Sequence, residues 1–325
     1  MAGSSTSSNA FSGHKETKMH WEQGSVFDIS WSSDGNLLTA TGTKGNPRTW
    51  RLERGGHKEG EELKALGHNI ERLCWNPSQQ SAHLLAAASY DRTVQLWDQK
   101  QSRVINKMQA TGYISDMCWS PVSGRYLATI SREEGKLEVF DQAASGALVV
   151  SAEVEDIVCT VRWDPTETML MLGTHQGAVE VYRWPSMQHI TRVQAHAAAC
   201  NCLAFGTPPI ASISGKTPMM VTGGADSMIE FWRLCDFSLE RSVAAHESPL
   251  LFADFSMDSR FLASASDDLA VRVHDTFSGE AVHSLNVDSM TTALEWHPRN
   301  LALAYGSAGS SKASVKPTVT IFLKT

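Results

Sequence analysis

The chain has 325 residues, of which 42% are hydrophobic and 19% are charged, and its formal net charge is −7 at pH 7. These values are typical of a globular protein and exclude a disordered or fibrous chain. The acidic balance gives no basic footprint for nucleic acid. The chain has no apolar run of about 18 residues that could span a membrane, and its start, MAGSSTSSNA, lacks the regions of a signal peptide. We therefore expect an intracellular protein without a membrane partner.

The first residues are small and polar, which predicts a disordered tail over residues 1–12. Beyond this tail, an aromatic residue that ends a short strand and precedes a polar turn recurs seven times, as in ISWSSDG, LCWNPSQ and MCWSPVS. The seven aromatics, 41 to 50 residues apart, are Trp31, Trp75, Trp119, Trp163, Phe205, Phe255 and Trp296. A period of this length indicates a repeat architecture over residues 13–325.

A second series follows the first within each repeat. Its members end strands such as TVQLWD and KLEVFD, and they are Trp50, Trp97, Phe140, Tyr182, Trp232, His274 and Phe322. Six residues before each lies a turn residue: Lys44, Asp91, Glu134, Gln176, Asp226, Asp268 and Lys316. Between the two series, segments such as HLLAAAS and RFLASAS predict a middle strand that packs between neighbouring sheets. Each repeat is therefore a four-stranded unit.

Together these marks resemble the WD-repeat family, and the resemblance covers residues 14–325. It implies an all-β fold, a seven-bladed β-propeller. In that family a His, a Ser or Thr, an Asp and a Trp form a hydrogen-bonded chain within one blade. The resemblance places the complete structural tetrad at His196, Thr222, Asp226 and Trp232. It places partial tetrads at His68, Asp91 and Trp97, where Ala87 replaces the hydroxyl, and at His246, Ser264 and Asp268, where His274 replaces the Trp.

The last repeat ends with TVTIFLKT, which reaches a third strand and stops. Its fourth strand must come from elsewhere in the chain. The segment GHKETKMHWEQG, residues 13–24, precedes the first strand of the first repeat. We expect it to complete the last blade and close the ring, since closure removes the exposed sheet edges of an open array.

The same His, Ser or Thr, and Asp residues could form a hydrolase triad. Their recurrence at one place in several repeats favours a structural role, tying loops to strands. The motif SGKT at residues 214–217 lacks the glycine of a phosphate-binding loop, because Ile210 stands there. We interpret it as part of an enlarged loop over residues 206–218. The six cysteines and twelve histidines show no metal-ligand spacing. We predict no enzyme, catalytic residue, metal, cofactor or small-molecule substrate.

Several stretches go beyond the general WD pattern. They are the YRWP exit of the fourth repeat, the AHAAACNCLAF entry to the fifth and the EWHPRNLALA of the seventh. These resemble the WD-repeat subunit family of the THO complex. The resemblance implies a nuclear, non-catalytic scaffold in the transcription-export (TREX) assembly, which acts in mRNA packaging and nuclear mRNA export. Its partners would be other THO subunits, a large helical one first, with RNA contacted only through the complex. The alternative is an adaptor that reads a peptide or histone tail.

Partners of a propeller bind its loops. The loops between second and third strands, and between fourth and next first strands, open on one face. On that face aromatic, Arg and polar residues favour a partner-binding rim: Tyr90, Arg92, Tyr113, Arg132, His175 and Gln176. The alternative is that these are ordinary solvated turn residues. On the opposite face, Trp184-Pro185 either docks a partner or covers the blade edge.

Overall fold

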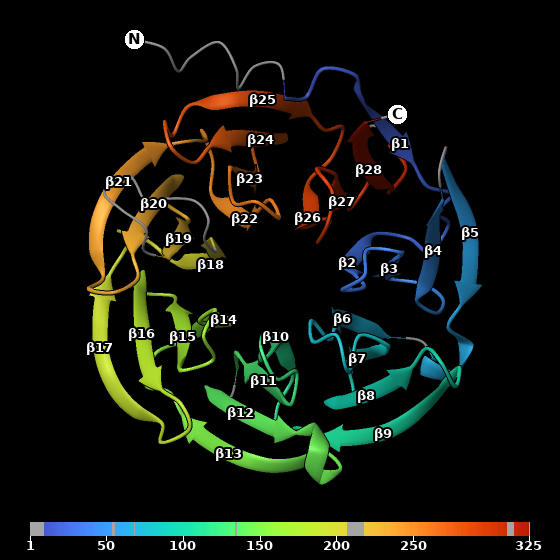
Figure 1. The fold of residues 1–325 in the computed structure, drawn as a ribbon, viewed down its shortest axis with the longest axis horizontal. Coiled ribbons are helices and arrows are strands. Elements are labelled where there is room, and N and C mark those ends of the chain that lie inside the picture. The colour runs from blue at the N-terminus through green and yellow to red at the C-terminus, as the bar shows by residue number, and fades with distance from the viewer. Residues whose placement is uncertain are drawn as a thin grey trace.

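The computed structural model describes residues 10–53, 56–67, 69–133, 135–206, 218–310 and 315–324. They form 28 strands in seven four-stranded antiparallel sheets and two short 3-10 helices, η1 (Lys64–Leu66) and η2 (Gln142–Ala144), with no α-helix among these residues. The sheets surround a central axis as seven blades (Figure 1). The predicted all-β, seven-bladed propeller is therefore confirmed.

Each of the first three blades uses four consecutive strands. Blade 1 contains β2 (Val26–Trp31), β3 (Leu37–Gly42), β4 (Arg48–Glu53) and β5 (Gly56–Glu62). Blade 2 contains β6 (Ile70–Trp75), β7 (Leu84–Ser89), β8 (Thr93–Asp98) and β9 (Arg103–Gln109). Blade 3 contains β10 (Ile114–Trp119), β11 (Tyr126–Ser131), β12 (Lys136–Asp141) and β13 (Ala147–Glu153).

The next three blades repeat this order, and the last departs from it. Blade 4 contains β14 (Val158–Trp163), β15 (Met169–Thr174), β16 (Ala178–Arg183) and β17 (Gln188–Gln194). Blade 5 contains β18 (Cys200–Gly206), β19 (Met219–Gly224), β20 (Met228–Arg233) and β21 (Ser238–Ala244). Blade 6 contains β22 (Leu250–Phe255), β23 (Phe261–Ser266), β24 (Ala270–Asp275) and β25 (Ala281–Asn286). Blade 7 contains β26 (Thr291–Trp296), β27 (Leu303–Ser307), β28 (Val319–Lys324) and β1 (His14–Lys18).

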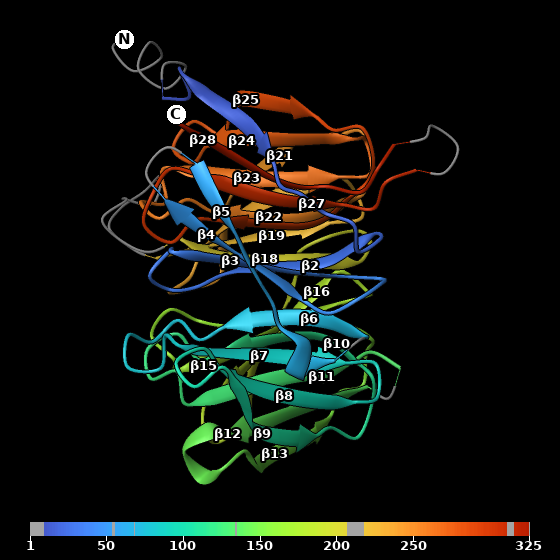
Figure 2. The same ribbon diagram turned by 90° about the vertical axis from the view of Figure 1, so that its right-hand side faces the viewer.

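The first strand of every blade lies nearest the axis and the fourth lies on the outer wall (Figure 1). In the side view, the connecting loops lie on two opposite faces (Figure 2). The second strands are the most buried; every residue of β7 and of β23 is buried. Their small and branched side chains fit between neighbouring sheets, so the core consists of apolar clusters between blades.

The ring closes where the two ends of the chain meet. Strand β1 pairs antiparallel with β28 over five residues, from His14 opposite Lys324 to Lys18 opposite Thr320 (Figure 1). The Tyr305 hydroxyl, on the second strand of blade 7, donates to the Glu16 carboxylate on β1. The predicted closure by an N-terminal strand is confirmed.

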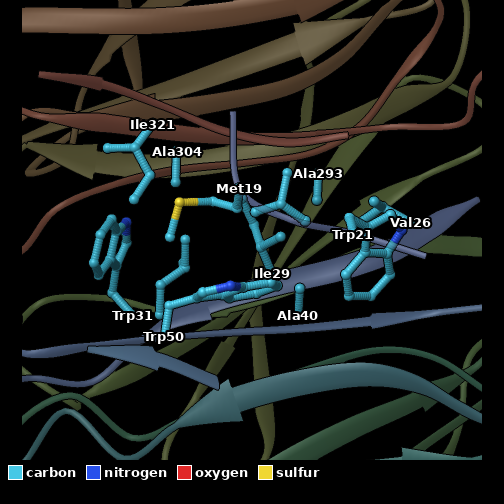
Figure 3. Close-up of a cluster of buried hydrophobic side chains, with 12 residues drawn as sticks. Met19, Trp21, Val26, Ile29, Trp31, Ala40, Trp50, Ala293, Ala304 and Ile321 are labelled. Atoms are coloured by element: carbon cyan, nitrogen blue, oxygen red, sulfur yellow. The ribbon is translucent and has the colours of Figure 1, made fainter. Parts of the chain in front are cut away.

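The residues after β1 fix the same junction by apolar packing. The cluster in Figure 3 joins the N-terminal segment, blade 1 and blade 7 through Met19, Trp21, Val26, Ile29, Trp31, Ala40, Trp50, Ala293, Ala304 and Ile321. Burial of a Met, Val or Ile side chain such as those in this cluster stabilises by roughly 1.5–3 kcal/mol. The N-terminal segment therefore links the first and last blades by packing as well as by strand pairing.

The predicted tail over residues 1–12 needs a correction at its end. Phe11 is buried, with its ring centroid 5.0 Å from Phe261 and 5.9 Å from Phe322. It also stacks on His283 at 5.5 Å. Packing on blades 6 and 7 thus begins before residue 13, because an apolar surface there accepts an aromatic ring. Residues 1–9 lie outside the described residues. So do residues 207–217, which contain the SGKT motif and most of the predicted loop.

Candidate functional site: blade networks and rim

In blade 5 the four residues of the predicted tetrad are joined by hydrogen bonds. The Trp232 indole N–H donates to Thr222 Oγ1 at 3.0 Å, and Thr222 Oγ1 lies 2.8 Å from His196 Nε2. His196 Nδ1 lies 3.0 Å from the Asp226 carboxylate. The hydroxyl accepts from the indole, so it donates to Nε2, and Nδ1–H donates to Asp226. Burial lowers the pKa of His196, which keeps this imidazole neutral.

Blade 6 has the same arrangement with a different fourth member. His246 Nε2 lies 2.8 Å from Ser264 Oγ, and its Nδ1 lies 3.0 Å from Asp268. His274, at the position of the Trp, places its Nε2 3.2 Å from the same serine oxygen. Arg272 donates to Asp268 at 2.5 Å and holds the carboxylate in place.

Blade 2 is different. Its His68 lies outside the described residues. The indole N–H of Trp97 donates to Gln99 Oε1 at 3.0 Å, because Ala87 offers no hydroxyl. Asp91 accepts from the backbone N–H of Thr93 at 3.0 Å. Within the described part of this blade, Asp91 and Trp97 therefore serve separate local bonds.

The hydroxyls of these networks are unsuited to nucleophilic attack. Thr222 and Ser264 are fully buried, and each is held between a histidine and an indole or imidazole nitrogen. A substrate in solvent could not reach them. The geometry supports a stabilising function, in which buried polar groups satisfy one another and fix loops to strands.

A second set of polar residues, absent from the sequence predictions, connects neighbouring blades around the axis. A carboxylate on one first strand accepts a backbone N–H of the next blade: Asp28 from Leu73 at 2.9 Å, Asp116 from Val161 at 3.1 Å, Asp254 from Trp296 at 2.7 Å and Glu295 from Trp31 at 3.0 Å. We call these four the channel carboxylates. Their signal in the sequence is an acidic residue three or one positions before the first-series aromatic.

The first-series tryptophans add parallel bonds. The indole N–H of Trp119 donates to the Cys74 carbonyl at 3.0 Å, and that of Trp163 donates to the Cys118 carbonyl at 3.3 Å. Each bond joins the first strand of one blade to that of the blade before. The recurring aromatic therefore connects blades as well as filling the space between them.

The channel carboxylates are in a poorly solvated environment. Burial raises the pKa of Asp28 and of Asp254 to about 6. Burial, together with the nearby Asp254 charge, raises that of Glu295 well above its usual range. Asp116 differs because Arg162 donates to it at 2.6 Å. These four bonds between blades are thus built at an electrostatic cost, which the Arg162 and Arg72 guanidinium groups offset only in part.

Three of the six predicted rim residues lie together on blades 2 and 3. Tyr90 has 68% of its surface exposed, and its ring lies edge-on to Tyr113 with the centroids 5.6 Å apart. The Tyr113 hydroxyl donates to the Glu71 carboxylate. Arg92 is exposed and donates to the Thr111 carbonyl at 3.3 Å. The structure thus forms a pair of an exposed and a half-buried tyrosine with the exposed Arg92 nearby in the chain, and we call these three residues the tyrosine rim.

The other three rim residues form separate contacts. Arg132 is exposed, with Nη2 3.8 Å from Cys159 Sγ. His175 and Gln176 are exposed, and Gln176 Oε1 accepts from Arg192 at 3.2 Å. In the part of the chain that the structure describes, hydrogen bonds join these three to other partners and not to the tyrosine rim, so the six do not form one continuous site.

On the opposite face, Trp184 covers the junction between blades 3 and 4. Its ring lies edge-on to Trp163 at 4.9 Å and to Tyr126 at 4.9 Å. Of the two alternatives for this turn, the geometry favours packing over docking.

Seven blades, a hydrogen-bonded His-Thr-Asp-Trp chain and closure by an N-terminal strand define a WD-repeat β-propeller. The model of the WD domain, G-beta repeat family matches residues 6–51, 60–98 and 237–275. Over 310 residues the chain is 28% identical to THO complex subunit 3 of Arabidopsis thaliana. The matched region covers 94% of this chain and 90% of that protein. The resemblance to the THO subunit family is therefore confirmed.

Other proteins are similar to this chain at lower identity or over a smaller part of it. The chain is 22% identical to WD repeat-containing protein AAC3 of Dictyostelium discoideum over 301 residues, 85% of this chain and 60% of that protein. It is 24% identical to Meiotic fizzy-related protein 1 of Schizosaccharomyces pombe over 177 residues, 54% of this chain and 39% of that protein. A model of eukaryotic translation initiation factor eIF2A matches residues 96–205, from the third strand of blade 2 to the first strand of blade 5.

Among the residues that the structure describes, no three His, Cys, Asp or Glu side chains gather in a way that could hold a metal ion. No helix in this part of the chain is long and apolar enough to cross a membrane.

The tetrad of blade 5 predicts a difference between two matched substitutions. Trp232→Phe removes the donor to the buried Thr222 hydroxyl and should lower the free energy of unfolding by about 1–2 kcal/mol more than Trp97→Phe, whose indole bonds only to Gln99. Both changes remove the same side-chain volume, so the difference isolates the hydrogen bond. Urea denaturation measures it. Equal losses would show that the blade 5 chain contributes no stability of its own.

His274 predicts a pH dependence. Burial, with repulsion between charged His274 and the His246 and Arg272 side chains, lowers its pKa to about 4, whereas the unfolded value is about 6.5. The unfolded chain therefore takes up the proton first, so stability is full above about pH 6.5 and falls as the pH drops toward 4. At pH 5 the loss from this residue is about 2 kcal/mol. His274→Phe, which matches Phe140 and Phe322 in other blades, should flatten the decrease in melting temperature from pH 7 to 5. An unchanged slope would disprove the assignment.

Proposed function

We propose that this chain is a non-catalytic scaffold subunit of a THO complex, acting in mRNA packaging and nuclear mRNA export. The observation that carries the proposal is the similarity to THO complex subunit 3, which extends across 94% of this chain and 90% of the relative. This similarity extends over nearly the whole ring, and it covers more of both proteins than the similarity to WD repeat-containing protein AAC3, which covers 85% of this chain and 60% of that protein. The proposed site of action is the nucleus, and the proposed partners are other THO subunits, a large helical subunit first.

The distribution of polar groups supports a scaffold. The Thr222 and Ser264 hydroxyls are sealed inside blades, and the channel carboxylates accept backbone N–H groups of neighbouring blades. An adaptor that reads a peptide in the central channel would need uncommitted polar groups there. The tyrosine rim instead presents the exposed Tyr90 beside Arg92, and Tyr and Arg are enriched among the residues that dominate binding energy at protein interfaces. We propose the tyrosine rim as a docking surface for the large subunit.

Charge argues against direct RNA binding by this chain. Its 28 Lys and Arg face 35 Asp and Glu, so the average field repels phosphate. The basic residues of blade 1, such as Arg51 and Lys58, alternate with the acidic Glu53, Glu61 and Glu62. No basic stretch interleaved with aromatics is present to stack single-stranded bases. RNA contact is therefore proposed to occur through the complex.

The proposal predicts subunit capture without RNA capture. The tagged chain, co-expressed with the large helical THO subunit, should retain that subunit on affinity resin, while the isolated chain binds RNA weakly at near-physiological salt. Tyr90→Ser should weaken capture about tenfold, equivalent to about 1.4 kcal/mol. The matched control is Phe277→Ser, since Phe277 is 66% exposed against 68% for Tyr90 and lies on the opposite face.

The outcomes separate the function from the surface. Tight, salt-sensitive RNA binding without subunit capture would contradict the scaffold function. Capture that resists Tyr90→Ser, or that falls equally with Phe277→Ser, would contradict the tyrosine rim as the docking surface while leaving the complex membership intact.

A further inference from the structure

One stretch of the outer wall carries no charge. Residues 142–152, QAASGALVVSA, contain no Asp, Glu, Lys or Arg, and every one of them is exposed or half-exposed. The stretch comprises η2 and all of β13 except its last residue, Glu153. Leu148 and Val149 are adjacent in it, and each exposes nearly half of its surface, 48% and 47%. We call residues 142–152 the uncharged strip.

The other outer strands differ. Charged side chains lie along β1, β5, β9, β17 and β21, for example Lys15, Lys58, Lys107, Arg192 and Arg241. Strand β25 lacks such residues, but Phe11 stacks on its His283 and covers it. Charges, covering segments and β-bulges are the usual means by which proteins prevent a sheet edge from pairing with another chain. A bulge does not distinguish β13, because β9, β17, β21 and β25 have one as well. Among the described outer strands, only β13 combines an uncharged centre with no covering segment.

Strand β13 is also an open edge. It is the last strand in the order β10-β11-β12-β13, and its ladder runs only to β12. That ladder shifts register so that Val149 is a bulge residue, and the outer strands β9, β17 and β21 have the same shift. Backbone N–H and C=O groups of alternate residues in an edge strand point away from the sheet and can pair with one more strand. An exposed, uncharged and partly apolar edge is therefore a site for strand addition.

We propose that β13 pairs antiparallel with β13 of a second copy of this chain, forming a two-fold dimer. Each copy has a net charge of −7, so two copies repel one another generally and approach best where the surface is uncharged. With the two-fold axis at Val150, Leu148 lies opposite Ala152, Val149 lies opposite Ser151, and Val150 lies opposite its own copy. The two most exposed apolar residues, Leu148 and Val149, therefore each meet a small one. The self-complementary pattern is what a two-fold interface requires.

The charged end of the strand sets the direction of pairing. In this antiparallel register Glu153 faces Ala147 of the other copy, and the two Glu153 carboxylates lie about 20 Å apart along the strands. Parallel pairing would place the two glutamates side by side. In β21, by contrast, the equivalent two-fold axis would place Arg241 directly opposite Arg241 of the other copy.

The dimer is a weak, concentration-dependent one. Pairing removes Leu148 and Val149 from water and satisfies backbone groups at the edge, but one strand pair buries less than the roughly 1,600 Å² of a standard interface. The inference is independent of the proposed function, because it concerns the outer wall rather than the tyrosine rim.

Sedimentation equilibrium of the full chain over a range of concentrations tests the proposal. The wild-type mass should rise from 35.5 kDa toward twice that value. Leu148→Lys, which places a charge in the pairing strip, should weaken dimerisation at least tenfold. Leu239→Lys is the matched control. Leu239 is 50% exposed, and it lies opposite Trp232 in blade 5 as Leu148 lies opposite Phe140 in blade 3. The Leu239→Lys chain should dimerise like the wild type.

A wild-type chain that stays monomeric at its highest soluble concentration would overturn the proposal, as would equal weakening by the two lysine variants. If Leu148→Lys does not fold, Val149→Lys on the same strand replaces it, with Ile190→Lys on β17 as its control. Ile190 is likewise a half-exposed apolar residue of an outer strand. Loss of dimer with Val149→Lys alone supports β13, and retention of the dimer refutes it.

Discussion

Strands β1 and β28 lie at opposite ends of the chain, yet they pair over five residues in the last blade. Six blades are each made from four consecutive strands, so they need only local chain reversals. Blade 7 needs both termini. Without β1, strand β28 would become an exposed edge, and Met19 and Trp21 would leave the cluster between blades 1 and 7. Loss of this pairing would convert a closed ring into an open array with an exposed edge and an exposed face.

The bonds around the channel depend on the same closure. Asp28, Asp116 and Asp254 each connect a first strand to the next blade along the chain. Glu295 provides the connection from blade 7 back to blade 1 by accepting the Trp31 N–H. That bond can form only in a closed ring. Burial raises the pKa of Asp28, Asp254 and Glu295, because a buried carboxylate loses hydration when it ionises. The packing between blades must offset the free energy of this lost hydration.

Much of this architecture could be predicted from the sequence, because repetition makes each weak signal recur. The two aromatic series fixed the number of blades, and an incomplete last repeat pointed to the N-terminal strand. The channel carboxylates were missed because they occupy two different positions: Asp28 and Asp116 lie three residues before the aromatic, and Asp254 and Glu295 one residue before. Both positions face the channel in a strand with a period of two, but neither forms a repeated motif by itself.

Contacts between segments that lie far apart in the chain could not be predicted from the sequence either. Phe11 looked like part of a polar tail, and only the surface of blades 6 and 7 explains its burial. The six rim residues share one face by topology, but which of them touch depends on the spacing between blades. Tyr90 and Tyr113 meet because adjacent loops of blades 2 and 3 bring them together, whereas Arg132 and Gln176 are engaged by Cys159 and Arg192.

The thermal unfolding of two truncated chains shows whether one N-terminal strand holds the seven blades in a single cooperative ring. Removal of residues 1–10 keeps Phe11 and β1 and should leave the melting temperature unchanged. Removal of residues 1–24 deletes β1, Met19 and Trp21, and it should lower the melting temperature of the entire ring in one transition. Equal melting temperatures for the two chains would show that residues 11–24 do not hold the ring closed.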